Sequence, residues 1–241
     1  MMKTIFYTAS LTLTTVSAQF QMDRIVDLAE QSLKLMNKTL PRYRGRNGVT
    51  AVLEGLQGYG CWCHFDAEHG KGRGIAVDRF DMECMNLHHA TTCMKMENCD
   101  LSVPFVPQMQ LTTDGNVAID CVIANGGDSC KEANCYSTNH FSSKLIDIML
   151  NPATGELPRY NAFSASRGFD RSTCKIAGAG SSIDEEKCCG SYDYNTMRPV
   201  RVPTGKRREC CEASFGIFVT YNPDFKSCCN GQVESFGSSA C

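Results

Sequence analysis

The chain contains Tyr59-Gly60-Cys61-Trp62-Cys63 and then, after a glycine-rich loop, Asp81-Met82-Glu83-Cys84-Met85-Asn86-Leu87-His88-His89. The second stretch lies inside a segment, 78–97, whose apolar residues recur at helical spacing. Cysteines that pair between long helices cross-link them side by side. These two stretches therefore predict a mainly α, disulfide-rich domain.

Three further segments read as helices. The spacing of apolar residues predicts a helix over 22–36, a shorter one over 49–56, and a long one over 116–150 that is interrupted at Gly126-Gly127. Asp23 stands where it can cap the first of them. The helices over 78–97 and 116–150 are expected to form the disulfide-framed pair.

Sixteen cysteines in 241 residues are typical of a secreted protein that folds in an oxidising compartment. The N-terminus agrees, because Lys3 precedes an apolar run over 5–16 and a small-residue cleavage site, Val16-Ser17-Ala18. We expect residues 1–18 to be a signal peptide. That run is shorter than the roughly 20 apolar residues of a membrane span, and no later run is long enough, so we expect no transmembrane segment.

Charge excludes one class of partner. The chain has 24 basic and 26 acidic residues, so it offers no electrostatic reason to bind nucleic acid. Asn37-Lys38-Thr39 is a sequon for N-glycosylation, which makes Asn37 a candidate glycosylation site.

The cysteines divide into two groups of eight, one ending at Cys135 and the other beginning at Cys174. An even number on each side lets each half close its own bridges. A loop rich in turn residues, 151–158, separates the halves. We therefore expect a first domain over 19–155 and a second over 156–241.

The two opening stretches resemble the secreted phospholipase A2 family. The resemblance covers about 59–144 and rests on YGCWC, the loop ending Gly72-Arg73-Gly74-Ile75-Ala76-Val77-Asp78, the helix from Cys84 to His88, and Cys130-x4-Cys135. It implies an antiparallel helix pair and calcium-dependent hydrolysis of the phospholipid sn-2 ester. In that chemistry a His deprotonates water, an Asp orients the His, and calcium stabilises the oxyanion.

The chain departs from the family at its defining acids. His88 is the candidate catalytic base, but His89 stands where the calcium-binding Asp follows it, and Thr138 stands where the orienting Asp is expected. The resemblance gives Trp62, His64, Asp66 and Gly72 as candidate calcium ligands; a solvated, charged loop is the alternative that we favour. We expect no cofactor, and Ca²⁺ only if the protein is an enzyme.

The family's disulfides also bear on the alignment. It links the positions of Thr91 and Ser137, and those of Glu83 and Lys144, and both members of each pair have lost cysteine here. The same alignment implies Cys63–Cys84, Cys99–Cys130 and Cys121–Cys135, and leaves Cys61–Cys93. The distance from Cys84 to His88 is one residue longer than the upstream count predicts, a rotation of about 100° on a helix.

The second half carries three cysteine doublets, 188–189, 210–211 and 228–229. Adjacent cysteines rarely bond each other, so each doublet sends bridges in two directions. With the Tyr-Asn dipeptides around them, the doublets resemble the repeats of galaxin-like skeletal matrix proteins, and we expect a small β or irregular module. A zinc module is disfavoured by the signal peptide and by the lack of Cys-x2-Cys pairs.

Five cations make this module locally basic: Arg198, Arg201, Lys206, Arg207 and Arg208. A solvated loop between doublets is the interpretation that we favour, and a surface for acidic polysaccharide or anionic phospholipid is the alternative. Two functions follow for the whole chain. The first is a secreted, non-catalytic binding component of an extracellular matrix, which includes biomineral matrices. The second is a calcium-dependent phospholipase A2 with His88 as base.

Overall fold

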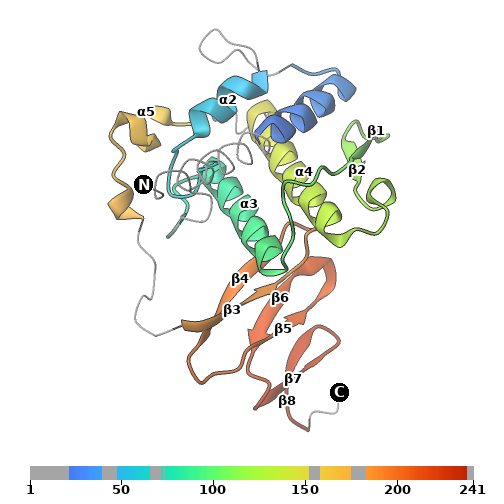
Figure 1. Cartoon of the computed structure of the whole chain (residues 1–241), viewed down its shortest axis with the longest axis vertical. Coiled ribbons are helices and arrows are strands. Elements are labelled where there is room, and N and C mark those ends of the chain that lie inside the picture. The colour runs from blue at the N-terminus through green and yellow to red at the C-terminus, as the bar shows by residue number, and fades with distance from the viewer. Residues whose placement is uncertain are drawn as a thin grey trace, which may run out of the picture.

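The computed structural model describes residues 22–39, 48–65, 72, 74–151, 158–174 and 183–237. The helices and one small β-hairpin gather at one end of this described part, and the other three β-hairpins lie at the other end (Figure 1). The protein is thus disulfide-rich and combines helices with small antiparallel sheets, as expected. The predicted signal peptide, 1–18, lies outside the described residues.

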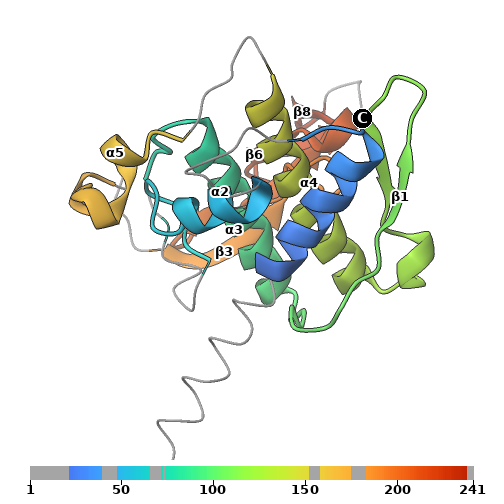
Figure 2. The ribbon, with the colours of Figure 1, turned by 90° about the horizontal axis from the view of Figure 1, so that it is seen from above.

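The helical part is built on two long helices, α3 (Arg79–Met96) and α4 (Ser129–Leu150), which pack side by side (Figures 1 and 2). A disulfide between Cys99 and Cys130 joins the end of α3 to the beginning of α4. At the other end of the pair, the Lys144 ammonium of α4 lies within electrostatic reach of Glu83 of α3. The two helices are therefore antiparallel.

A helix over 22–35 and α2 (Gly48–Leu56) cover one side of this pair (Figure 2). The core between them is aliphatic and aromatic, and its most buried members are at most 1% exposed: Ile25, Val52, Leu53, Leu56, Tyr59, Phe80, Leu87 and Phe141. Burial of such side chains is the main favourable contribution to folding. The predicted helices over 22–36, 49–56 and 78–97 agree with the structure within two residues at each end.

The prediction of helix from residue 116 is wrong. Strand β2 (Val117–Asp120) pairs with β1 (Gln108–Leu111), and a 3-10 turn, η1 (Ile123–Asn125), follows. Gly126 and Gly127 both have positive φ, and a right-handed helix cannot continue through residues in that conformation. Helix α4 starts only after Asp128, whose side chain accepts a hydrogen bond from the Lys131 N–H at 3.1 Å.

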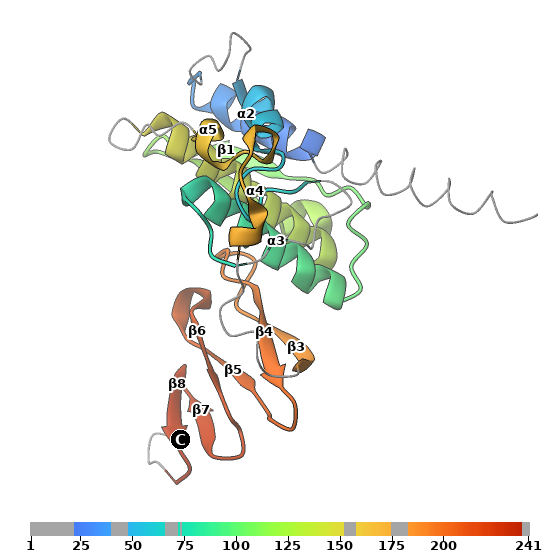
Figure 3. The ribbon, with the colours of Figure 1, turned by 90° about the vertical axis from the view of Figure 1, so that its left-hand side faces the viewer.

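The C-terminal part consists of three hairpins: β3 (Ile183–Cys189) with β4 (Arg198–Pro203), β5 (Glu209–Glu212) with β6 (Phe218–Tyr221), and β7 (Lys226–Cys229) with β8 (Gln232–Ser235). Figure 3 shows them following one another away from the helices. The last hairpin turns on Asn230-Gly231, both with positive φ, as a two-residue turn between twisted strands requires. A side chain at 231 would also meet the Ala213 backbone at 2.8 Å, so this turn packs closely under β5.

Disulfides hold these parts together. The structure contains Cys63–Cys84, Cys99–Cys130 and Cys121–Cys135, as expected. The expected Cys61–Cys93 pair is wrong, because Cys61 bonds Cys174 and Cys93 bonds Cys188. The two halves therefore do not each close their own bridges. An even number of cysteines in a segment does not show that these cysteines bond one another. The doublets do bond in two directions, as Cys188–Cys93 and Cys189–Cys210 show.

The segment 158–174 packs on the helices, although the cysteine count groups it with the second half. Short helix α5 (Tyr160–Phe163) places the Tyr160 ring 5.8 Å from that of Tyr59, and the Tyr160 hydroxyl donates to the Val52 carbonyl at 3.2 Å. The hairpins meet the helical part through the Cys93–Cys188 disulfide and through polar contacts such as that between His140 and Asp193. Among the described helices, none has the combination of length and apolarity that crossing a bilayer requires.

Candidate functional site

A buried carboxylate, Asp81, organises the loop that precedes α3. It is 0% exposed and accepts three backbone hydrogen bonds, from the N–H groups of Cys61, Trp62 and Val77 at 3.0, 2.8 and 2.9 Å. Burial raises the pKa of Asp81, and the three donors oppose that rise. This carboxylate therefore connects YGCWC and the end of the glycine-rich loop to the first turn of α3.

The YGCWC motif contains glycine because of this carboxylate. Gly60 has φ +60°, and a Cβ there would stand 2.4 Å from the Asp81 Cγ. Asp81 is not among the site residues predicted from the sequence. The available signal was its position three residues after Asp78, which caps α3 by accepting from the Asp81 N–H at 3.0 Å. An acid in the first turn of a helix is a common stabilising feature.

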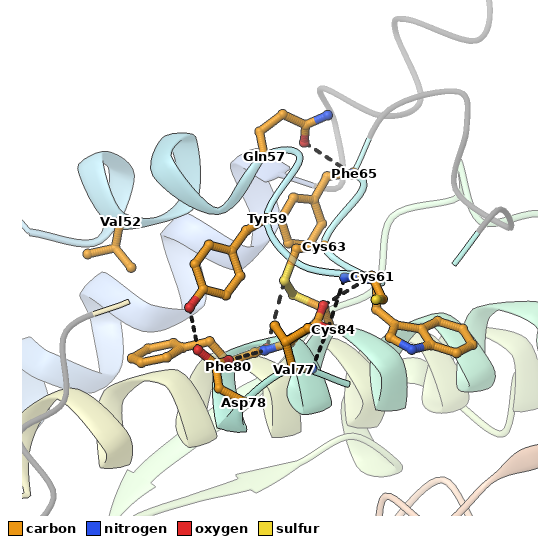
Figure 4. Close-up of a disulfide and its surroundings, with 12 residues drawn as sticks. Val52, Gln57, Tyr59, Cys61, Cys63, Phe65, Val77, Asp78, Phe80 and Cys84 are labelled. Atoms are coloured by element: carbon orange, nitrogen blue, oxygen red, sulfur yellow. Dashed lines mark hydrogen bonds between the residues drawn. A yellow bond between two sulfur atoms is a disulfide. The ribbon is translucent and has the colours of Figure 1, made fainter. Parts of the chain in front are cut away.

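A second polar pair closes the same region. The buried Tyr59 hydroxyl donates to the Asp78 carboxylate and accepts from the Arg159 N–H at 3.1 Å. Figure 4 shows Tyr59 and Asp78 facing each other beside the Cys63–Cys84 bridge. Burial and the Asp78 carboxylate raise the pKa of Tyr59, so it stays a neutral donor. The first turn of α3 is thus held from two sides.

The Cys63–Cys84 bridge attaches α3 to the loop that precedes it. Cys84 is therefore the reference point from which residues are counted along the helix. Helix α3 runs without a break from Arg79 to Met96, so no extra residue is absorbed between Cys84 and the histidines. If the resemblance to phospholipase A2 is followed with the upstream count, Leu87 and not His88 corresponds to that family's catalytic His. Leu87 is 1% exposed and belongs to the hydrophobic core. His88 follows about 100° further around the helix, where that count places the calcium-binding Asp.

The structure brings both histidines to the Trp62 side chain. The indole lies edge-on to the His88 and His89 rings, with centroids 5.2 and 5.0 Å away. His88 is 5% exposed. Gly72 is pressed against the same indole, since a Cβ there would lie 2.2 Å from a ring carbon. The structure therefore brings three of the predicted site residues together around one indole: Trp62, His88 and Gly72.

Of the four candidate calcium ligands, the structure describes Trp62, His64 and Gly72. Calcium takes six to eight oxygens. The Trp62 carbonyl already accepts from the His64 N–H at 2.8 Å, and the Gly74 carbonyl accepts from the Trp62 indole at 3.2 Å. His64 itself is buried and offers nitrogen, and Asp66 lies outside the described residues. No group of three His, Cys, Asp or Glu side chains suited to a metal occurs in the part of the chain that is described.

On α4, the position at which the resemblance implies the orienting Asp holds a neutral residue, Thr138. Thr138 is 1% exposed, and its hydroxyl donates to the Asn134 side chain at 3.3 Å. At Glu83 and Lys144, one of the two pairs for which the resemblance implies a lost disulfide, the side chains interact electrostatically: burial raises the pKa of Glu83, and Asn86 and Lys144 oppose this. The other lost pair, Thr91 and Ser137, is buried at 2% and 1% exposure.

His89 lines a cavity of about 260 Å³ between α3 and the hairpins. Across this cavity lies Arg198, whose guanidinium stacks 4.6 Å above the Phe218 ring. Burial and the Arg198 charge lower the pKa of His89 to about 4. A second contact across this boundary joins His140 Nε2 to the Asp193 carbonyl at 2.8 Å. Sequence analysis placed Arg198 with the other cations of the module, and nothing in the sequence signals its approach to His89.

Acid is expected to weaken the fold through His89. The unfolded histidine titrates near pH 6.5, whereas the folded one stays neutral down to about pH 4, so protons bind the unfolded state preferentially between these values. Stability should fall as pH drops through this window, by about 1–2 kcal/mol, because solvent reaches part of the ring. Urea unfolding between pH 4 and 7 measures this. His89→Gln should flatten the profile; an unchanged slope would contradict the assignment.

Of the remaining predicted sites, Asn37 lies exposed just after the helix over 22–35 and has φ 51°. No protein family, curated protein or solved structure compared with this chain matches it.

Proposed function

We propose that this protein is secreted and acts, without catalysis, as a binding component of an extracellular matrix, on a phospholipase A2-like helix pair. The mineralised setting is what the galaxin-like doublets imply. The observation that carries the proposal is Leu87, which fills the core position where the upstream count puts the catalytic His. The density of disulfides supports an oxidising, extracytoplasmic environment.

We expect no activity because the chain lacks the groups that ester hydrolysis needs. The reaction needs a base that accepts a proton from water, an acid that orients this base, and a cation that stabilises the oxyanion. In this chain a leucine, a threonine and a histidine stand at the corresponding positions. None of the three side chains supplies the negative charge that the orienting and metal-binding roles require.

The alternative is a calcium-dependent phospholipase A2 that hydrolyses the sn-2 ester with His88 as base. It is favoured by one observation: His88 is held in a buried position against Trp62, beside the glycine-rich loop. On this alternative, calcium ligands and an orienting group come from a rebuilt site. The two functions predict opposite results in one assay.

Fatty acid release from mixed phospholipid micelles is expected to be the same in millimolar calcium and in chelator, and no higher than without protein. His88→Ala should leave this background unchanged, because Leu87 and not His88 takes the catalytic position. His140→Ala is the matched control, since His140 contacts the hairpins and not the loop. Calcium-dependent release that His88→Ala abolishes and His140→Ala preserves would overturn the proposal. A secreted phospholipase A2 of known activity validates the micelles.

A further inference from the structure

The hairpin part contains a groove of about 500 Å³ to which all three hairpins contribute. The turn between β4 and β5 contributes Lys206, Arg207 and Arg208 to its lining. Strand β6, strand β7 and the loop between them contribute Tyr221, Phe225 and Lys226. We propose that this groove binds a linear anionic polysaccharide, with sulfate or carboxylate groups along a sugar chain. This inference rests on the proposed matrix function and names its ligand class and its site.

The positive charge of the groove is local. Residues 183–237 carry seven Lys or Arg and eight Asp or Glu, so the hairpins as a whole do not attract anions. Two of the five cations grouped by sequence lie elsewhere: Arg198 stacks on Phe218, and Arg201 is 3.9 Å from the Glu186 carboxylate. The groove instead gains Lys226, which is far from the others in sequence. Folding thus places Lys226 on the same concave surface as Lys206, Arg207 and Arg208.

These cations remain available to a ligand to different degrees. Arg207 pairs with Asp224 at 3.1 Å, and the Arg208 guanidinium donates to the Thr220 hydroxyl at 3.1 Å. Lys206 and Lys226 form no ion pair within the described residues. The Arg207–Asp224 pair is exposed, so it is weak, and an incoming sulfate can replace the carboxylate as the partner of Arg207.

Aromatic and apolar side chains complete the groove. Phe225 is 71% exposed and Val219 56%, while Tyr221 is half-buried. A large apolar side chain left in solvent marks an interaction site when it lines a hollow with polar groups. Aromatic rings offer sugar rings a flat apolar face, while the cations bind their acidic substituents. The combination matches an acidic sugar chain better than a simple inorganic anion.

The groove is also preorganised. The Cys189–Cys210 bridge connects the first hairpin to the second, and the Cys211–Cys228 bridge connects the second to the third. A cross-linked site loses little conformational entropy on binding. A concave groove lined with cations favours a chain that enters it over a flat membrane, which meets only protruding groups. An anionic bilayer is therefore the competing occupant that the experiment must exclude.

The experiment measures binding of the full secreted chain to immobilised heparin, desulfated heparin, and vesicles with and without phosphatidylserine, at 0.15 M salt. The test variant is Lys206→Gln/Arg207→Gln/Arg208→Gln. The control, Lys34→Gln/Lys38→Gln/Lys95→Gln, removes the same charge from exposed positions in the helical part, distant in sequence from the groove. We expect the test variant to bind heparin about tenfold more weakly or worse, and the control to bind within about twofold of the unmodified protein. Desulfation should weaken binding similarly.

Phe225→Ala keeps the net charge and tests the groove itself, with severalfold weaker heparin binding expected. Unfolding temperatures show whether each variant is folded. Equal loss in the control triple, preference for anionic vesicles, or no heparin binding by the unmodified protein would each overturn the inference. Fatty acid release by the test variant is assayed in parallel. If heparin binding does not depend on the groove, the proposal of a non-catalytic function stands. Calcium-dependent fatty acid release would overturn that proposal and has no bearing on heparin binding in the groove.

Discussion

Replacing Asp81 with alanine is expected to lower the free energy of unfolding by about 3–5 kcal/mol. The carboxylate is fully buried and satisfies the N–H groups of Cys61, Trp62 and Val77. Alanine leaves all three donors without this acceptor, and each unsatisfied buried donor costs about 1–3 kcal/mol. Chemical denaturation of the oxidised protein measures the loss. A change below about 1 kcal/mol would show that the loop does not depend on this carboxylate.

Two variants control for this result. Glu30→Ala removes the same charge from an exposed position in the helix over 22–35, and should change stability by at most about 0.5 kcal/mol. Gly60→Ala keeps Asp81 but introduces a Cβ at 2.4 Å from its Cγ, at a residue with φ +60°. It should therefore destabilise the same loop by a different route. If Asp81→Ala is severe and Gly60→Ala is silent, the close approach of these two residues is wrong.

The second large effect is expected at the bridge between the two parts of the molecule. Cys93→Ser/Cys188→Ser should cost about 2–4 kcal/mol, because this disulfide links residues 95 apart along the chain. It should also release the hairpins as a separate unit. The contacts that remain there include the Tyr192–Glu97 hydrogen bond at 3.2 Å, which is exposed and so contributes little.

Hydrogen exchange tests this release directly. In the double variant, amides of β3 and β4 should exchange faster, while those of α2 keep their protection. The matched control is Cys99→Ser/Cys130→Ser, which removes a bridge inside the helical part and leaves Cys93–Cys188 in place. It should destabilise the helices without selective exposure of β3 and β4. Equal exchange at the hairpins in both variants would contradict the role given to Cys93–Cys188.

Local pattern accounts for most of the helical part. The helices over 22–35, 48–56 and 79–96 follow from apolar residues at helical spacing, and Asp78 caps the third as its side chain permits. The failure at 116–128 has a local cause too. A short apolar run such as Val117–Ile119 suits a strand as well as a helix, and only its partner β1 decides between them.

By itself, the sequence determined the helical segments over 22–35, 48–56 and 79–96 and the glycine and cysteine positions of YGCWC. The tertiary structure decided what depends on distant partners: the Cys61–Cys174 and Cys93–Cys188 bridges, the burial of Asp81, and the division of the basic cluster that left Lys206–Arg208 beside Lys226. The physical reason is range. Helical spacing and capping act within a few residues, whereas disulfides, buried charges and grooves require segments that only the completed fold brings together.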